Sequence, residues 1–272
     1  MVGLRRALLA LFVVGVVFAG FDVALVLTSE HDSQKAVNAI LGPLIGLSFI
    51  GTGVFAWWRR PLNRFGLLMC AVGFAWFVGG LREANDAAVF TIGSYLGSLY
   101  LVLVIHLLLA FPTGRLETAA ARAIVVAAYV DALLVTLPFF LLGGDLGGGD
   151  DAPGNAFAIV REPGAAQVFD TLSALVAVGI ATATVLVLVR KRRVATPPQR
   201  RAQAPMLWTG LALITSLGLT FLATAAGGPD VVVSSSGWAS SSRLRSCRTR
   251  SSPGWCGRAT RAPARSARSS SA

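Results

Sequence analysis

The chain has 272 residues, of which 54% are hydrophobic and only 14% are charged. Soluble domains contain about 25% charged residues, so this composition excludes an ordinary water-soluble domain. The net charge is +11, but the basic residues lie at the ends of apolar blocks and in the C-terminal tail, which argues against a nucleic-acid-binding protein.

The apolar blocks predict seven transmembrane helices. A helix rises about 1.5 Å per residue, so about 20 apolar residues cross the hydrocarbon core of a bilayer. We expect an all-α polytopic bundle over residues 1–229. The predicted spans are 7–28, 37–58, 65–81, 89–111, 123–142, 165–189 and 206–226.

The first block has an alternative interpretation. Val17-Phe18-Ala19 resembles a signal-peptide cleavage site, and a short basic head with Arg5 and Arg6 precedes the block. The apolar run continues past Ala19, however, and this favours a retained span. In either case the chain emerges on the far side of the membrane.

The distribution of Lys and Arg predicts the orientation, because cytoplasmic loops carry the excess of these residues. Thirteen basic residues fall on one side and three, Lys35, Arg82 and Arg161, on the other. We therefore expect a multi-pass protein of the plasma membrane with a cytoplasmic N-terminus and an external acidic loop at 143–164. The thirteen are Arg5, Arg6, Arg59, Arg60, Arg64, Arg115, Arg122, Arg190, Lys191, Arg192, Arg193, Arg200 and Arg201.

The composition changes at the C-terminus. Residues 230–272 are rich in Ser and Arg and have neither helical nor strand periodicity, which is typical of a disordered tail. A second interpretation is a shift of reading frame near residue 230, because seven spans starting inside would leave the eight arginines of this tail outside, against the charge rule. On that hypothesis the chain is a truncated product.

Two turns resemble a known family. Arg59-Arg60-Pro61-Leu62-Asn63-Arg64-Phe65-Gly66 and Leu109-Ala110-Phe111-Pro112-Thr113-Gly114-Arg115-Leu116 are similar to turns in the membrane regions of sensor histidine kinases from high-GC Gram-positive bacteria. The resemblance implies a polytopic input region followed by a cytoplasmic kinase. The two histidines, His31 and His106, do not lie in a phosphoacceptor helix, so we expect an input region that lacks the kinase and is not an enzyme.

The sequence offers one candidate site. Asp22, His106, Asp131 and Asp170 lie within or near spans, where ionisable groups are costly and usually face a partner or a cavity. His106 and Asp131 are each about two turns from the inner end of their spans, so an intramembrane polar pair is expected. Asp22 and Asp170 lie nearer the outer ends, where a structural role is expected. No pattern indicates a catalytic, cofactor-binding or metal-ligating residue.

The function predicted from these observations is the sensor, or input, region of a two-component system. The alternative is a small transporter or permease-like protein, although spans 1–3 and 4–6 show no internal repeat. A third interpretation, an integral-membrane enzyme, would need more polar residues at one depth. The expected partners are the lipid bilayer and a second copy of the chain, without nucleic acid, and the ligand is unknown.

Overall fold

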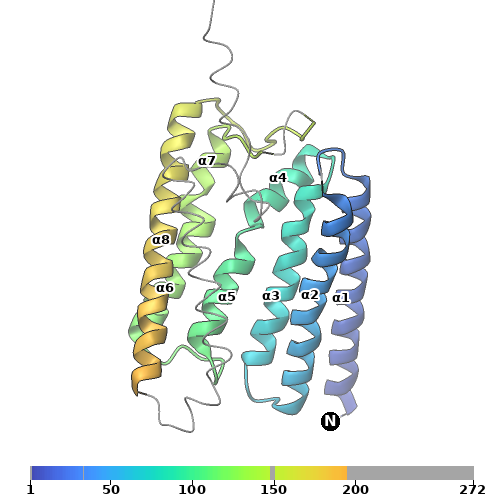
Figure 1. Ribbon diagram of the computed structural model, residues 1–272, viewed down its shortest axis with the longest axis vertical. Coiled ribbons are helices and arrows are strands. Elements are labelled where there is room, and N and C mark those ends of the chain that lie inside the picture. Colours follow the sequence, from blue (N-terminus) through green and yellow to red (C-terminus); the bar gives the residue numbers. More distant parts are fainter. Residues whose placement is uncertain (1, 33, 148–150, 195–272) are drawn as a thin grey trace, which may run out of the picture. The chain divides into compact units, whose positions relative to one another are not determined.

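The computed structural model describes residues 2–32, 34–147 and 151–194 (Figure 1). The described part is helical and contains no strand. The seventh predicted span, 206–226, and the predicted disordered tail, 230–272, lie outside the described residues. The helices are α1 (Val2–Thr28), α2 (Lys35–Arg59), α3 (Phe65–Gly80), α4 (Ala87–Leu96), α5 (Leu99–Ala110), α6 (Ala119–Val130), α7 (Leu137–Leu141) and α8 (Pro163–Val194), with a 3-10 turn η1 (Leu81–Glu83) and a π-helical turn η2 (Asp131–Val135).

Six segments of the described chain are long and apolar enough to cross a membrane, which supports a multi-pass membrane protein. Large apolar side chains on them are exposed: Val17 by 64%, Val126 by 60% and Leu134 by 62%. Such exposure suits helices that face hydrocarbon. The segments agree with the first six predicted spans and are Gly3–Thr28, Lys35–Arg59, Phe65–Glu83, Ala87–Ala110, Ala119–Leu141 and Pro163–Arg193.

The first three helices pack in chain order, α1 against α2 and α2 against α3 (Figure 1). Glycines permit the close approach of α2 and α3. A Cβ on Gly66 would lie 2.7 Å from the carbonyl oxygen of Gly53, and one on Gly73 would lie 2.7 Å from that of Gly46. Small residues let transmembrane helices come into backbone contact in this way.

The later helices pack around α5. α5 contacts α3, α6 and α8, and α6 also contacts α8. A buried cluster at this junction includes Val72 of α3, Leu108 of α5, Val125 of α6 and Leu188 of α8. α5 therefore joins the α1–α3 packing to the α6–α8 packing.

The structure corrects the predicted helices in two ways. The fourth and fifth spans are not single helices, because a turn at Gly97 and Ser98 separates α4 from α5 and η2 interrupts the fifth span. Two spans also extend further than predicted. α1 begins at Val2, and α8 continues through the basic residues 190–193, whose long side chains can reach water from a helix end.

Candidate functional site

Asp131 lies at the irregular turn η2 and is only 8% exposed. The Ser173 hydroxyl of α8 donates to Oδ2 of Asp131 at 3.4 Å. Thr136, at the end of η2, donates from both its backbone N–H and its hydroxyl to the Asp131 carbonyl, at 3.1 and 2.8 Å. The Tyr95 hydroxyl of α4 donates to the Leu133 carbonyl and so connects η2 with a third helix. Irregular turns of this kind are frequent at functional sites.

Four buried side-chain atoms have no hydrogen-bond partner among the described residues. One is at η2, and the other three are in α4, in α5 and in the turn between them. They are Oδ1 of Asp131, Oγ of Ser94, Oγ of Ser98 and Nδ1 of His106. The last three belong to the fourth span, with Ser94 in α4, Ser98 in the turn before α5 and His106 in α5. A buried polar group without a partner costs about 1–3 kcal/mol, so each of these atoms is suited to bond a polar ligand or a water molecule.

The levels of His106 and Asp131 differ by about one turn. Val102 shares a buried cluster with Ala128 and Ala132, which flank Asp131 in sequence, so Asp131 lies at the level of Val102. His106 is one turn further along α5, where its ring meets that of Tyr129 edge to face at 6.3 Å. His106 contacts Tyr129 of α6, whereas the Asp131 carboxylate accepts from Ser173 of α8, and Nδ1 of His106 and Oδ1 of Asp131 do not bond each other. The pair as such stays a prediction.

The other two ionisable residues lie elsewhere. Asp22 of α1 is 5% exposed, and its carboxylate lies against α2 and α3. A Cβ on Gly42 would be 2.9 Å from its Oδ2, and one on Gly80 would be 1.9 Å from its Oδ1. Asp170 is exposed on α8. The four residues that the sequence singled out therefore do not form one cluster.

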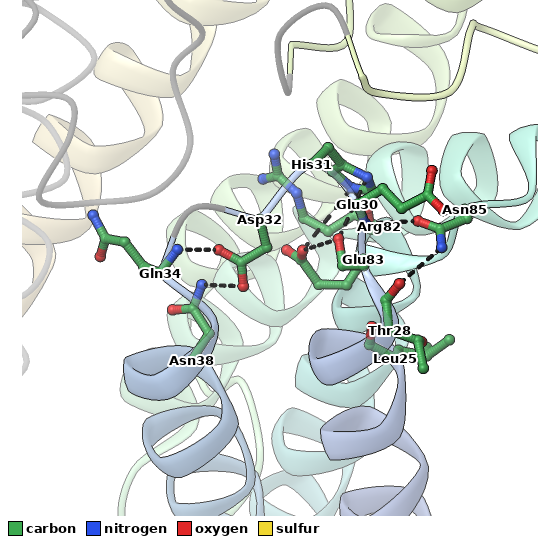
Figure 2. Close-up of polar contacts among 11 residues, drawn as sticks. Leu25, Thr28, Glu30, His31, Asp32, Gln34, Asn38, Arg82, Glu83 and Asn85 are labelled. Carbon is green, nitrogen blue, oxygen red and sulfur yellow. Dashed lines mark hydrogen bonds and ion pairs between the residues drawn. The ribbon is translucent and has the colours of Figure 1, made fainter.

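A polar cluster covers the ends of α1 and α3 (Figure 2). The Arg82 carbonyl can only accept, so Nε2 of His31 donates to it at 3.0 Å. The same nitrogen lies 4.0 Å from a Glu83 oxygen. The Asn85 side chain accepts from the Glu30 N–H at 3.0 Å and donates to the Thr28 carbonyl at 2.9 Å. These bonds fasten the loop after α1 to the turn after α3.

The α2–α3 turn and the α5–α6 turn contact each other at the opposite end of the helices. The Asn63 amide donates to the Pro112 carbonyl at 3.0 Å, and the Phe111–Pro112 peptide bond before this carbonyl is cis. The Phe65 and Phe111 rings meet edge to face at 5.4 Å. We call this the basic end, because it contains Arg60, Arg64 and Arg115. The sequence predicts both turns on one side of the membrane, and the structure adds that they touch.

Lys191, near the end of α8, also contacts this end. Its ammonium donates to the carbonyls of Leu109, at 3.4 Å, and of Phe111. Leu109 lies in the last turn of α5 and Phe111 is its C-cap, and a cation is favourable here because the helix dipole is negative at this end. The sequence showed the basic cluster but not this contact, which depends on how α8 packs against α5.

Comparison with protein families, with curated proteins and with solved structures gives no match. Within the described ranges, no group of three His, Cys, Asp or Glu side chains could hold a metal ion. The candidate site is therefore defined by its geometry, which is a buried carboxylate with hydroxyl partners at an irregular turn.

Proposed function

We propose that this chain is the membrane-embedded input region of a sensor resembling the two-component histidine kinases. In this proposal it lies in the plasma membrane with its N-terminus and basic end in the cytoplasm, and it changes conformation without performing catalysis. The resemblance of the two turns at the basic end supports this family, and the contacts of α8 support the mechanism.

The observation on which the mechanism rests is that α8 contacts both the irregular turn and the basic end. Ser173 bonds Asp131 at η2, and Lys191 bonds the end of α5. These two residues are 18 positions apart on one helix, which corresponds to about 27 Å. A change in the hydrogen bonding of Asp131 would shift α8, and the shift would reach the α5–α6 turn through Lys191. Small helix shifts of this kind are a common means of signalling.

A transporter is the second candidate, and the interrupted spans favour it. The break between α4 and α5 and the turn η2 leave irregular backbone in two segments that could cross the membrane. Transporters commonly build substrate sites from discontinuous helices.

Thiol accessibility separates the two functions. Ser94→Cys, Ser98→Cys and Val102→Cys would be made in a background without Cys70, Cys247 and Cys256. A membrane-impermeant thiol reagent would then be applied to either side of sealed vesicles. A sensor predicts labelling from at most one side, whereas a transporter that alternates between two open states predicts labelling from both. Val126→Cys, on an exposed face of α6, is the control and should label from neither side.

The gene provides a test of the family. The DNA after the codon for Pro229 would be translated in the other two frames. The proposal expects an apolar block of about 20 residues, enough for a further span, followed by a charged amphipathic helix with a histidine. Two frames without such a block would remove the support for a sensor kinase but leave the transporter standing.

A further inference from the structure

We propose that the groove between the two turns of the basic end binds the phosphate group of an anionic phospholipid. The groove has a volume of about 690 Å³ and is shallow and widely open. This inference goes beyond the proposed function, since a sensor and a transporter could each have such a site. The groove is lined by Arg60, Pro61, Leu62, Asn63, Thr113, Arg115 and Glu117.

The charges of the groove suit a phosphate. Arg60 comes from the α2–α3 turn and Arg115 from the α5–α6 turn, and both are exposed. Neither forms an ion pair with a carboxylate in the described part of the chain. The one acid of the lining, Glu117, already accepts a hydrogen bond from the Thr113 hydroxyl at 3.1 Å. Guanidinium groups from both turns suit a phosphate, whose oxygens match the planar fork of arginine.

The walls of the groove are held in place before any ligand binds. The Asn63 amide bonds the Pro112 carbonyl, and the Asn63 side-chain oxygen accepts from the Phe65 N–H at 2.9 Å. Gly114 has a φ of +72°, and a Cβ there would lie 2.3 Å from the Phe65 nitrogen. The two turns are therefore in backbone contact. Binding then orders little further chain, which lowers its entropic cost.

The surroundings favour a lipid over a free phosphate ion. The groove lies at the ends of helices that are long and apolar enough to cross a membrane, where headgroups are found. Leu62 in its lining is 96% exposed, and Trp58 in the preceding helical turn is 54% exposed. These apolar side chains would contact the glycerol and the upper acyl chains. Basic pockets at helix ends are typical sites of anionic headgroups.

The test uses the full chain in nanodiscs of phosphatidylcholine with a trace of fluorescent phosphatidylglycerol as the probe. The variant Arg60→Gln/Arg115→Gln removes both groove cations. The control Arg6→Gln/Arg122→Gln removes two exposed arginines predicted at the same membrane face, so the net charge is equal. All four positions are exposed, and thermal unfolding checks that each variant folds. We expect the groove variant to lose about tenfold or more in probe affinity and the control to lose little.

Three results would overturn the proposal. Equal losses in the two variants would mean a general surface-charge effect. Unchanged affinity in the groove variant would mean that the groove is not the site. If millimolar inorganic phosphate displaced the probe from the unmodified chain as effectively as unlabelled phosphatidylglycerol does, the groove would be assigned to a soluble phosphate. If unlabelled phosphatidylglycerol releases the probe and inorganic phosphate does not, the result supports a lipid as the ligand of the groove.

Discussion

At Gly114 the chain needs two properties that alanine lacks. Its φ is +72°, and its position against the Phe65 nitrogen leaves no space for a Cβ. A left-handed conformation costs a non-glycine residue about 1–2 kcal/mol, and the backbone clash adds to this. We predict that Gly114→Ala destabilises the chain by about 2 kcal/mol or more, measured by denaturant titration in mixed micelles.

Gly154 is the matched control for this substitution. It is also a loop glycine, but its φ is ordinary and nothing lies within 4 Å of the position that a Cβ would take. Gly154→Ala should leave the stability nearly unchanged. Equal effects of the two substitutions would contradict the contact between the two turns.

Asp131 and Ser173 should be energetically coupled, because the Ser173 hydroxyl bonds the Asp131 carboxylate. We predict that Asp131→Ala and Ser173→Ala together cost less than the sum of their separate effects. The expected coupling is about 0.5–1.5 kcal/mol in a double-mutant cycle in detergent, since a hydrogen bond contributes about this much. Additive effects would mean that the hydrogen bond contributes nothing.

The same cycle with His106→Ala and Asp131→Asn tests the pair that the sequence predicted. Nδ1 of His106 and Oδ1 of Asp131 both lack a partner in the described chain, although they do not bond each other. Coupling would then have to pass through a bound water or ligand between them. We expect weaker coupling than for Asp131 with Ser173, and strict additivity would count against the pair.

Among the elements, α2 and α3 depend on glycines at their interface. Gly66→Ala and Gly73→Ala would each place a methyl group within 2.7 Å of a backbone carbonyl of α2. Backbone cannot move aside as a flexible side chain can, so each substitution should separate the helices and cost about 1–3 kcal/mol. Gly179→Ala on α8 has nothing within 4 Å and should be neutral or slightly stabilising. If all three variants lost stability, the loss would be a general effect of replacing glycine in these helices and not an effect of the packing of α2 against α3.

Lys191 provides a prediction for α8. Lys191→Met keeps most of the length of the side chain but removes the donor to the Leu109 and Phe111 carbonyls. A hydrogen bond from a charged group contributes about 1.5–3 kcal/mol, so a loss of roughly that size is expected in the same titration. Lys191→Arg retains a donor and should lose less. If methionine were as stable as lysine, α8 would not be fastened to α5, and the proposed signalling route would lose its last step.

The sequence predicted elements better than contacts. The first six spans were placed within a few residues, because apolar blocks bounded by arginines and prolines determine helices in a membrane directly. The interruptions at Gly97 and η2 were not predicted. Asp131 was singled out as an acid within a span, but an extra residue in a helical turn leaves the composition unchanged, so the sequence does not mark the turn. The turn packing was also missed, because the Asn63 and Pro112 contact joins segments 49 residues apart.

At the scale of the whole molecule, the two ends of the described spans differ in charge. Arginines crowd the basic end, whereas the opposite end contains the His31–Glu83 contact and the loop with Asp145 and Asp151. The excess of Lys and Arg on cytoplasmic loops predicts the basic end inside. Orientation is thus a prediction from charge, while the crossings themselves are a prediction from helix length.

Two exposed apolar residues test both predictions in one experiment. Leu62 is 96% exposed at the basic end, and Ile159 is 78% exposed in the loop after α7. Three apolar segments, Phe65–Glu83, Ala87–Ala110 and Ala119–Leu141, separate them. An odd number of crossings places the two residues on opposite sides, whatever the orientation. Leu62→Cys and Ile159→Cys would each be made in a background without other cysteines and exposed to an impermeant thiol reagent.

In intact cells only Ile159→Cys should be labelled, and Leu62→Cys should react once the membrane is permeabilised. The reverse pattern would keep the crossings but invert the orientation, so the charge rule would fail for this chain and the groove of the basic end would face the outer leaflet. Labelling of both positions in intact cells would contradict an odd number of crossings. Since the two side chains are comparably exposed, a difference in labelling between them reports the side of the membrane and not local burial.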